Sequence, residues 1–283
     1  MSLEQSVEDL LSLLDTDVKS QAIEYLSATP FSELNEETKA HVFFKLLEKN
    51  CFEPLYNLSL VYFPKNMSLL IKKCIIDNDA CKVLMNISRV FEESNMIILM
   101  EPNFEQLINS NHAYMFGALL NISRLKESHN LILQYLPSWK RNEFTIGILK
   151  NLAFDCSTHA YLLDLLPDYL DQIVATGFRE SIIQDERVLE AFDKDEISDY
   201  VFNVSEHVID EPPLAMIELI IILLNGSTST RQQLLHLGIY FILRHLDIYA
   251  TEHKWVDVNQ LILNAVELIL AKDEKERVYE SEE

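Results

Sequence analysis

Glycine and proline are scarce in this chain, with five glycines and eight prolines among 283 residues. Tight hairpins, phosphate-binding loops and dinucleotide-binding loops all need glycine at fixed positions, so the sequence leaves little material for them. Hydrophobic residues make up 48% of the chain and charged residues 24%, which is enough to bury a substantial core. The composition therefore favours an all-helical fold over a sheet protein.

Basic residues are also few. The chain has 23 lysines and arginines against 45 aspartates and glutamates, a formal net charge of −22. The cations occur singly or in pairs and form no basic patch, so the chain would repel phosphate backbones and anionic membranes. We expect neither nucleic acid nor a membrane as partner.

Long apolar runs and signal sequences are lacking. The longest apolar run, at 214–224, is interrupted by Glu218 and is much shorter than the roughly 20 residues that span a bilayer. The first residues lack the basic and apolar regions of a secretory signal. We expect a cytoplasmic protein, in which the Asn-x-Ser sequences belong to a repeat and carry no glycan.

Catalytic and metal-binding motifs are missing as well. The four cysteines form no CxxC pair, the eight histidines form no HExxH, and no GxSxG or glycine-rich phosphate loop is present. The nearest approach to a ligand pair is Cys156 with His159, whereas a structural zinc needs about four ligands. We therefore expect no catalytic residues, no metal and no cofactor, and we interpret the cysteines as reduced core thiols.

What the sequence does contain is a repeated motif. Leu-Met-Asn-Ile-Ser-Arg at 84–89 returns as Leu-Leu-Asn-Ile-Ser-Arg at 119–124. Looser copies are centred on four further asparagines: Asn57, Asn151, Asn225 and Asn264. If the longest interval hides one degenerate copy, the mean step is about 35 residues, which is typical of stacked helical repeats. The pattern predicts an all-α, armadillo/HEAT-like, right-handed helical-repeat solenoid.

The pattern along the chain predicts five segments. They are an N-terminal helical cap at 1–48, armadillo-like repeats at 49–179, an acidic insertion or connecting segment at 180–211, C-terminal helical repeats at 212–271 and a charged flexible tail at 272–283. The acidic segment holds eleven carboxylates and two cations. Apolar spacing further predicts helices at about 3–14, 18–26, 35–47, 214–224, 230–237, 239–249 and 256–270.

The repeated asparagine lies away from the core stripe of its helix. Helical spacing places Lys82, Asn86 and Arg89 on one face, about 100° from Leu84 and Ile87. The corresponding positions of three successive repeats form a ladder, which we predict to be a concave client-binding surface: Lys82, Asn86, Arg89, Gly117, Asn121, Arg124, Gly147, Asn151 and Phe154.

Two interpretations of the asparagines are open. A carboxamide both donates and accepts, so a row of them can pair with the peptide groups of an extended chain. Alternatively, each amide ties its helix to the neighbouring repeat through buried hydrogen bonds. Arg89 and Arg124 favour binding slightly, because exposed cations at repeat spacing would meet an acidic client.

The Leu-x-Asn-apolar signature resembles armadillo repeats, and the residues downstream of it are similar to the Hgh family. The residues that carry this likeness are Asn151, Phe154, Asp155, His159, Arg231, Gly238-Ile239-Tyr240 and Ile242-Leu243-Arg244. The resemblance implies a cytosolic, armadillo-like chaperone adaptor that is not an enzyme. It implies as partners newly made or partly folded eukaryotic translation elongation factor 2, the cytosolic chaperonin and the Hsp90 co-chaperone system.

The alternative function is an armadillo-type scaffold or nuclear-import adaptor that binds extended peptides. An import adaptor needs tryptophan four residues before each asparagine, to clamp the aliphatic stems of a basic peptide. Those positions hold Lys82, Gly117, Gly147, Ile221 and Gln260. We expect the protein to be a monomer.

Overall fold

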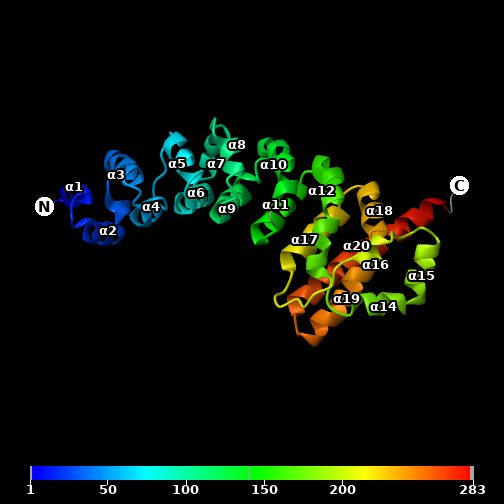
Figure 1. Cartoon of the computed structure of the whole chain (residues 1–283). Helices are drawn as coiled ribbons and strands as arrows, with labels where there is room; N and C mark the ends of the chain where they lie inside the picture. The colour runs from blue at the N-terminus through cyan, green and yellow to red at the C-terminus, as the bar shows by residue number, and fades with distance from the viewer. Residues whose placement is uncertain (1, 140, 281–283) are drawn as a thin grey trace. The chain divides into compact units, whose positions relative to one another are not determined.

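The computed structural model describes residues 2–139 and 141–280, and in these ranges the regular structure is helical (Figure 1). The described residues contain no β-strand, and a single isolated bridge joins Ala175 to His207. The prediction of an all-α fold is confirmed. The chain divides into two compact units, Met1–Trp139 and Lys140–Glu283.

The first unit contains short helices joined by tight turns. They are α1 (Leu3–Ser12), α2 (Lys19–Ser27), α3 (Glu36–Glu48), α4 (Phe52–Leu58), α5 (Ser68–Cys74), α6 (Asn78–Val90), α7 (Glu92–Leu99), α8 (Phe104–Ile108), α9 (Ala113–Ile122) and α10 (His129–Tyr135). Polar residues fix where several begin: the side chains of Ser2, Asn35 and Asp77 accept hydrogen bonds from the first turns of α1, α3 and α6. The three helices predicted between residues 1 and 48 are confirmed to within about two residues.

Successive repeats of the first unit pack through the helices that carry the asparagine. Helix α4 packs against α2, α6 against α4, and α9 against α6. Leu84 and Ile87 of α6 are fully buried, as is Ile122 of α9, while Leu119 is 1% exposed. The apolar stripe predicted on these helices is therefore core, and its burial holds neighbouring repeats together.

The second unit contains α11 (Glu143–Ala153), α12 (His159–Leu165), α13 (Pro167–Leu170), α14 (Phe178–Ile183), α15 (Glu186–Asp193), α16 (Tyr200–Asn203), α17 (Leu214–Leu224), α18 (Thr228–His236), α19 (Ile239–Glu252) and α20 (Val256–Glu280). Helix α17 packs against α11 and α20, and α19 packs against α20. The four helices predicted after residue 212 are present, and α17 matches its prediction to the residue. Gly238 follows α18 with a φ of +76°, the left-handed conformation expected of a helix C-terminus.

The acidic segment 180–211 lies inside the second unit. Parts of α14, all of α15 and all of α16 fall within it, and Val188 and Val201 are buried. The boundary between the two units follows Trp139. The predicted divisions at residues 48, 179 and 211 stay predictions. Of the predicted tail 272–283, the part to Glu280 is helical and residues 281–283 lie outside the described residues.

Among the described residues, no helix combines the length and the apolar character that crossing a membrane requires.

Candidate protein-binding groove

The repeat asparagines of the first unit point into the stack. Asn86 is fully buried, and its Nδ2 donates to the carbonyl oxygen of Tyr56 and to Oγ of Ser59, each at 3.3 Å. Its Oδ1 accepts from Nη2 of Arg89 at 3.3 Å. One repeat earlier, Asn57 Nδ2 donates to the carbonyl oxygen of Ser27 at 2.9 Å. Each amide therefore ties its helix to the helix of the preceding repeat.

Asn121 makes the corresponding tie in the next repeat. Its Nδ2 donates to Oγ of Ser88 at 3.0 Å and to the carbonyl oxygen of Gly117 at 3.1 Å. The accepting serines follow the asparagines by two residues, since Ser59 follows Asn57 and Ser88 follows Asn86. The Asn-x-Ser pattern is thus a two-part connector, in which the serine of one repeat accepts from the asparagine of the next.

The serine hydroxyl serves both helices at once. Ser59 Oγ donates to the carbonyl oxygen of Tyr56 at 2.6 Å, and Ser88 Oγ donates to that of Met85 at 2.9 Å. Its proton is thereby held within its own helix, and the oxygen lone pairs are left for the amide of the next repeat. This arrangement satisfies polar groups inside an apolar stack, where an unpaired one would cost about 1–3 kcal/mol.

The predicted ladder is corrected on this point. The amides of Asn86 and Asn121 do not face outward, because the helix face that carries them is covered by the preceding repeat, and the buried-tie interpretation holds for both. Gly117 is also buried. Arg89 and Arg124 are exposed at the ends of their helices.

In the second unit the three predicted ladder residues lie on or just after α11. Gly147 and Asn151 are half-buried, whereas the side chain of Phe154 is 70% exposed. The asparagines of the two later motif copies bond within their own helices. Asn225 is exposed, and its Nδ2 donates to the carbonyl oxygen of Ile221. Asn264 is exposed, and its Oδ1 accepts from Nε2 of Gln260. Whether the ladder residues bind a client stays a prediction.

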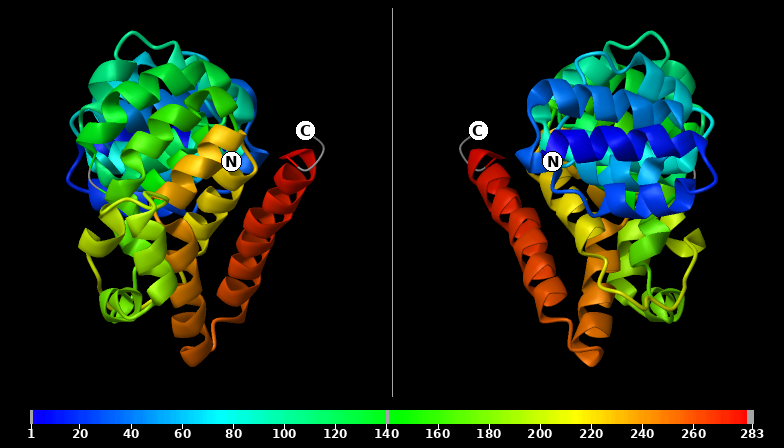
Figure 2. Two further views of the ribbon diagram at one scale, coloured as in Figure 1. Left: turned by 90° about the vertical axis from the view of Figure 1, so that its right-hand side faces the viewer. Right: turned by 90° about the vertical axis from the view of Figure 1, so that its left-hand side faces the viewer.

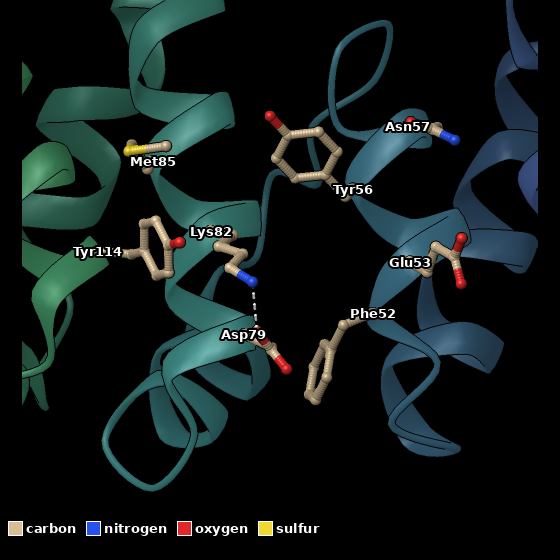
Figure 3. Close-up of a pocket in the computed structure, with 8 residues that line it drawn as sticks. All are labelled: Phe52, Glu53, Tyr56, Asn57, Asp79, Lys82, Met85 and Tyr114. Carbon is tan, nitrogen blue, oxygen red and sulfur yellow. Dashed lines mark ion pairs between the residues drawn. The ribbon is translucent and has the colours of Figure 1, made fainter.

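A groove lies beside the ladder, between α4 and α6 and reaching α9 (Figure 3). Its volume is about 540 Å³. The residues that line it are Phe52, Glu53, Tyr56 and Asn57 of α4, Asp79, Lys82 and Met85 of α6, and Tyr114 of α9. Three aromatic rings and a methionine line it together with the charged side chains of Glu53, Asp79 and Lys82.

Lys82 is the one ladder residue that lines this groove. Its Nζ lies 2.7 Å from Oδ1 of Asp79 and 4.8 Å from the centre of the Tyr114 ring. The hydrogen bond to Asp79 raises the pKa of Lys82 above its usual value, so the ammonium stays charged. A cation over an aromatic face at this distance is attracted to the ring, which orients Lys82 along the groove.

The groove is built from equivalent positions of consecutive repeats. Glu53 and Lys82 each stand four residues before a repeat asparagine, Tyr56 and Met85 stand one before, and Asp79 and Tyr114 stand seven before. Positions at these offsets share one face of a helix. These faces of α4, α6 and α9 meet along one groove.

Sequence reasoning missed Tyr56, Met85 and Tyr114. The signal was present, because the variable residue of the Leu-x-Asn motif lies on the same face as Lys82 one turn away. That position was treated as a spacer within the motif, and the residue seven before each asparagine was not considered. Steps of three residues starting from the position before each asparagine give the groove-facing side of each helix, but they do not show which helices meet.

The interpretation of the cysteines as core thiols agrees with the burial of Cys51, Cys74 and Cys81 and is wrong for Cys156, which is exposed. His159 is buried, and its Nε2 lies 2.7 Å from the carbonyl oxygen of Ala153. No group of three or more histidine, cysteine, aspartate or glutamate side chains within the described residues is arranged to hold a metal ion.

Comparison with known proteins found no family model, no curated protein and no solved structure that matches this chain.

Proposed function

We propose that the helices of this chain form an armadillo-like right-handed solenoid that acts as a non-catalytic chaperone adaptor in the cytosol. Its client is newly made or partly folded translation elongation factor 2, which it links to the cytosolic chaperonin and the Hsp90 system. The solenoid is supported by the asparagine ties, which join α2, α4, α6 and α9 in series. The identity of the client rests on the resemblance to the Hgh family.

The observation that carries the binding function is the groove lined by equivalent positions of consecutive repeats. An extended polypeptide advances about 3.3 Å per residue, so a few residues of it span the distance between packed helices. Tyr56, Tyr114 and Met85 offer apolar contact area for a client side chain. Glu53 and Asn57 also line the groove, and their side-chain oxygens are acceptors for client N–H groups.

The exposed arginines at the ends of α6 and α9 support an acidic stretch in the client. Arg89 and Arg124 lie 35 residues apart in sequence at the same position of adjacent repeats. Both side chains are exposed, so charge reversal adds no buried charge, but at Arg89 it also removes the hydrogen bond to Oδ1 of Asn86. Helical content and stability are therefore measured beside client binding. We expect the Arg89→Glu, Arg124→Glu double variant to capture less client at unchanged helical content.

The first experiment is affinity purification of the protein from native eukaryotic cytosol. Elongation factor 2 and chaperonin subunits are expected to dominate the recovered proteins. A nuclear-import receptor in their place would refute the chaperone proposal in favour of the import alternative. Recovery of neither would leave the solenoid without its proposed client and refute the assignment.

The second experiment tests the groove with purified, partly unfolded elongation factor 2. Tyr56→Ala removes an aromatic wall of the groove, and we expect the affinity to fall about tenfold, as for a residue at the centre of an interface. Tyr25→Ala is the matched control, because Tyr25 lies on α2 outside the groove and is 66% exposed. Equal affinities of the two folded variants would exclude this groove as the client site.

A further inference from the structure

Helix α20 has a second apolar face that no part of the described chain covers. Its buried residues, Val258, Ile262, Ala265 and Ile269, pack on the side that meets α17 and α19. Three other apolar residues of this helix remain in solvent: Val256 is 75% exposed, Leu263 51% and Leu270 55%. They are spaced by seven residues, or about two helical turns, and so form a stripe along the helix axis.

Val256 and Leu263 of this stripe line a groove between α19 and α20, which diverge from the turn that joins them (Figure 2). The groove has a volume of about 580 Å³. Tyr240, Arg244 and Asp247 of α19 form one wall, while Val256 and Leu263 of α20 form the other. A groove between two helices whose apolar residues Val256 and Leu263 stand two turns apart fits a helix laid along α20, since a partner helix presents its own apolar residues at the same interval.

The charges of the second unit define the chemistry of that helix. Residues 140–283 contain 27 acidic and 12 basic residues, a net charge of −15 of the total −22. On α19 and on α20 as far as residue 270, four carboxylates stand against one cation, Arg244. Arg244 is already engaged, with its Nη1 3.2 Å from Oδ2 of Asp185. Asp247 is the one carboxylate among the residues that line the groove, and Asp257 and Glu267 lie elsewhere on α20. The net negative charge of the unit attracts a basic occupant and repels an acidic one.

We propose that the α19–α20 groove is a docking site for a basic amphipathic helix of a partner protein. The leucine-type residues of that helix insert against Leu263 and Val256, and its lysines or arginines lie beside Asp247 and the carboxylates of α20. This site is separate from the client groove of the first unit, so loss of either activity leaves the other intact.

The test uses a fluorescein-labelled synthetic helix of leucine and lysine, with all leucines on one face, and measures its binding by fluorescence anisotropy at physiological ionic strength. Leu263→Asp removes apolar contact and adds a negative charge. Binding through apolar docking is expected to weaken about fivefold. Binding by charge alone would instead strengthen. A rise in affinity, or no change, would overturn the proposal.

Two controls make the result specific. Ile76→Asp is the same kind of change at an 80% exposed residue of the first unit, and it is expected to leave the affinity unchanged. A peptide of identical composition with its leucines spread around the helix is expected to bind at least fivefold more weakly than the amphipathic one. Equal binding of the two peptides, or an equal effect of the two substitutions, would refute docking in the groove.

A second variant, Val256→Asp, tests whether weaker binding by Leu263→Asp arises from misfolding. Val256→Asp places a carboxylate in the first turn of α20, where negative charge stabilises a helix, and it is expected to weaken peptide binding while the helical content by circular dichroism stays unchanged. Sedimentation of the protein alone tests a second copy as occupant. A dimer that both substitutions dissociate would show that the groove takes another copy of this chain and would overturn the partner-helix proposal.

Discussion

Replacement of Asn86 by alanine tests whether the repeat asparagine is a structural tie. The side chain is fully buried and holds the preceding repeat through two donated hydrogen bonds of 3.3 Å. Each such bond contributes about 1 kcal/mol, and these are at the long end of the usual range. Alanine gains about 0.5 kcal/mol in helix propensity, while the lost amide volume leaves a small cavity. We expect a net loss of about 2 kcal/mol.

The matched control is Asn109→Ala in the same unit. Asn109 is exposed, and its Nδ2 donates to the carbonyl oxygen of Glu105 in its own helix at 3.0 Å. Substitution at such a surface position is expected to change stability by no more than about 0.5 kcal/mol. The control therefore measures the loss of an exposed amide that bonds only within its own helix, against a buried amide that joins two repeats.

The assay exploits the two tryptophans, one in each unit. In a Trp255→Phe background, Trp139 reports on the first unit alone, and its fluorescence is followed through a urea titration. A double-mutant cycle with Ser59→Ala isolates the bond between Ser59 and Asn86, with an expected coupling of about 0.5–1 kcal/mol. Equal losses at Asn86 and Asn109, or a coupling near zero, would refute the assignment of the asparagine as a tie.

Three further outcomes are expected. Gly226→Ala should destabilise the second unit by about 1–3 kcal/mol, because a Cβ there would lie 2.6 Å from the His159 ring; an unchanged urea midpoint would contradict this packing. Of the four cysteines, Cys156 alone should react rapidly with a thiol reagent in the native protein, and fast modification of a second thiol would contradict the burial of the others. The hydrogen bond from Arg187 lowers the pKa of Asp185 below its usual 3.8, so its contribution to stability is present above that pH and is lost as the pH falls through the folded-state pKa. A carboxyl titration by NMR should give a midpoint below 3.8, and a midpoint at or above it would exclude the ion pair.

The helices were largely predictable from the sequence because local signals agree along most of the chain. Apolar residues at three- and four-residue spacing, capping residues such as Asn35 and the glycine after α18 all act within a few residues of the helix they define. Helix α17 is the clearest case, since an apolar run that follows two prolines leaves no competing boundary. The second apolar stripe of α20 is equally visible in the sequence, but its meaning depends on which faces the neighbouring helices cover.

The groove of the first unit was not predictable in the same way. Lys82 was identified because it stands four residues before a repeat asparagine. Tyr56 and Tyr114 stand one and seven residues before their own asparagines, but they belong to different repeats. Their approach to Lys82 depends on the lateral packing of α4, α6 and α9, which no single helix encodes. Sequence periodicity gives the face of each helix, and the stacking decides which faces meet.

The asparagine motif shows most clearly what the sequence determines and what tertiary packing determines. The sequence alone determined that Leu-x-Asn lies on a helix, that its leucine is core and that it recurs at repeat spacing. It left open whether the amide faces a client or the neighbouring repeat. Asn86 and Asn225 occupy the same motif, yet Asn86 is fully buried against Ser59 and Asn225 is exposed. The difference arises because a hydrogen bond between repeats needs a partner 27 to 33 residues away in sequence. Only the tertiary packing of one repeat on the next places that serine within reach.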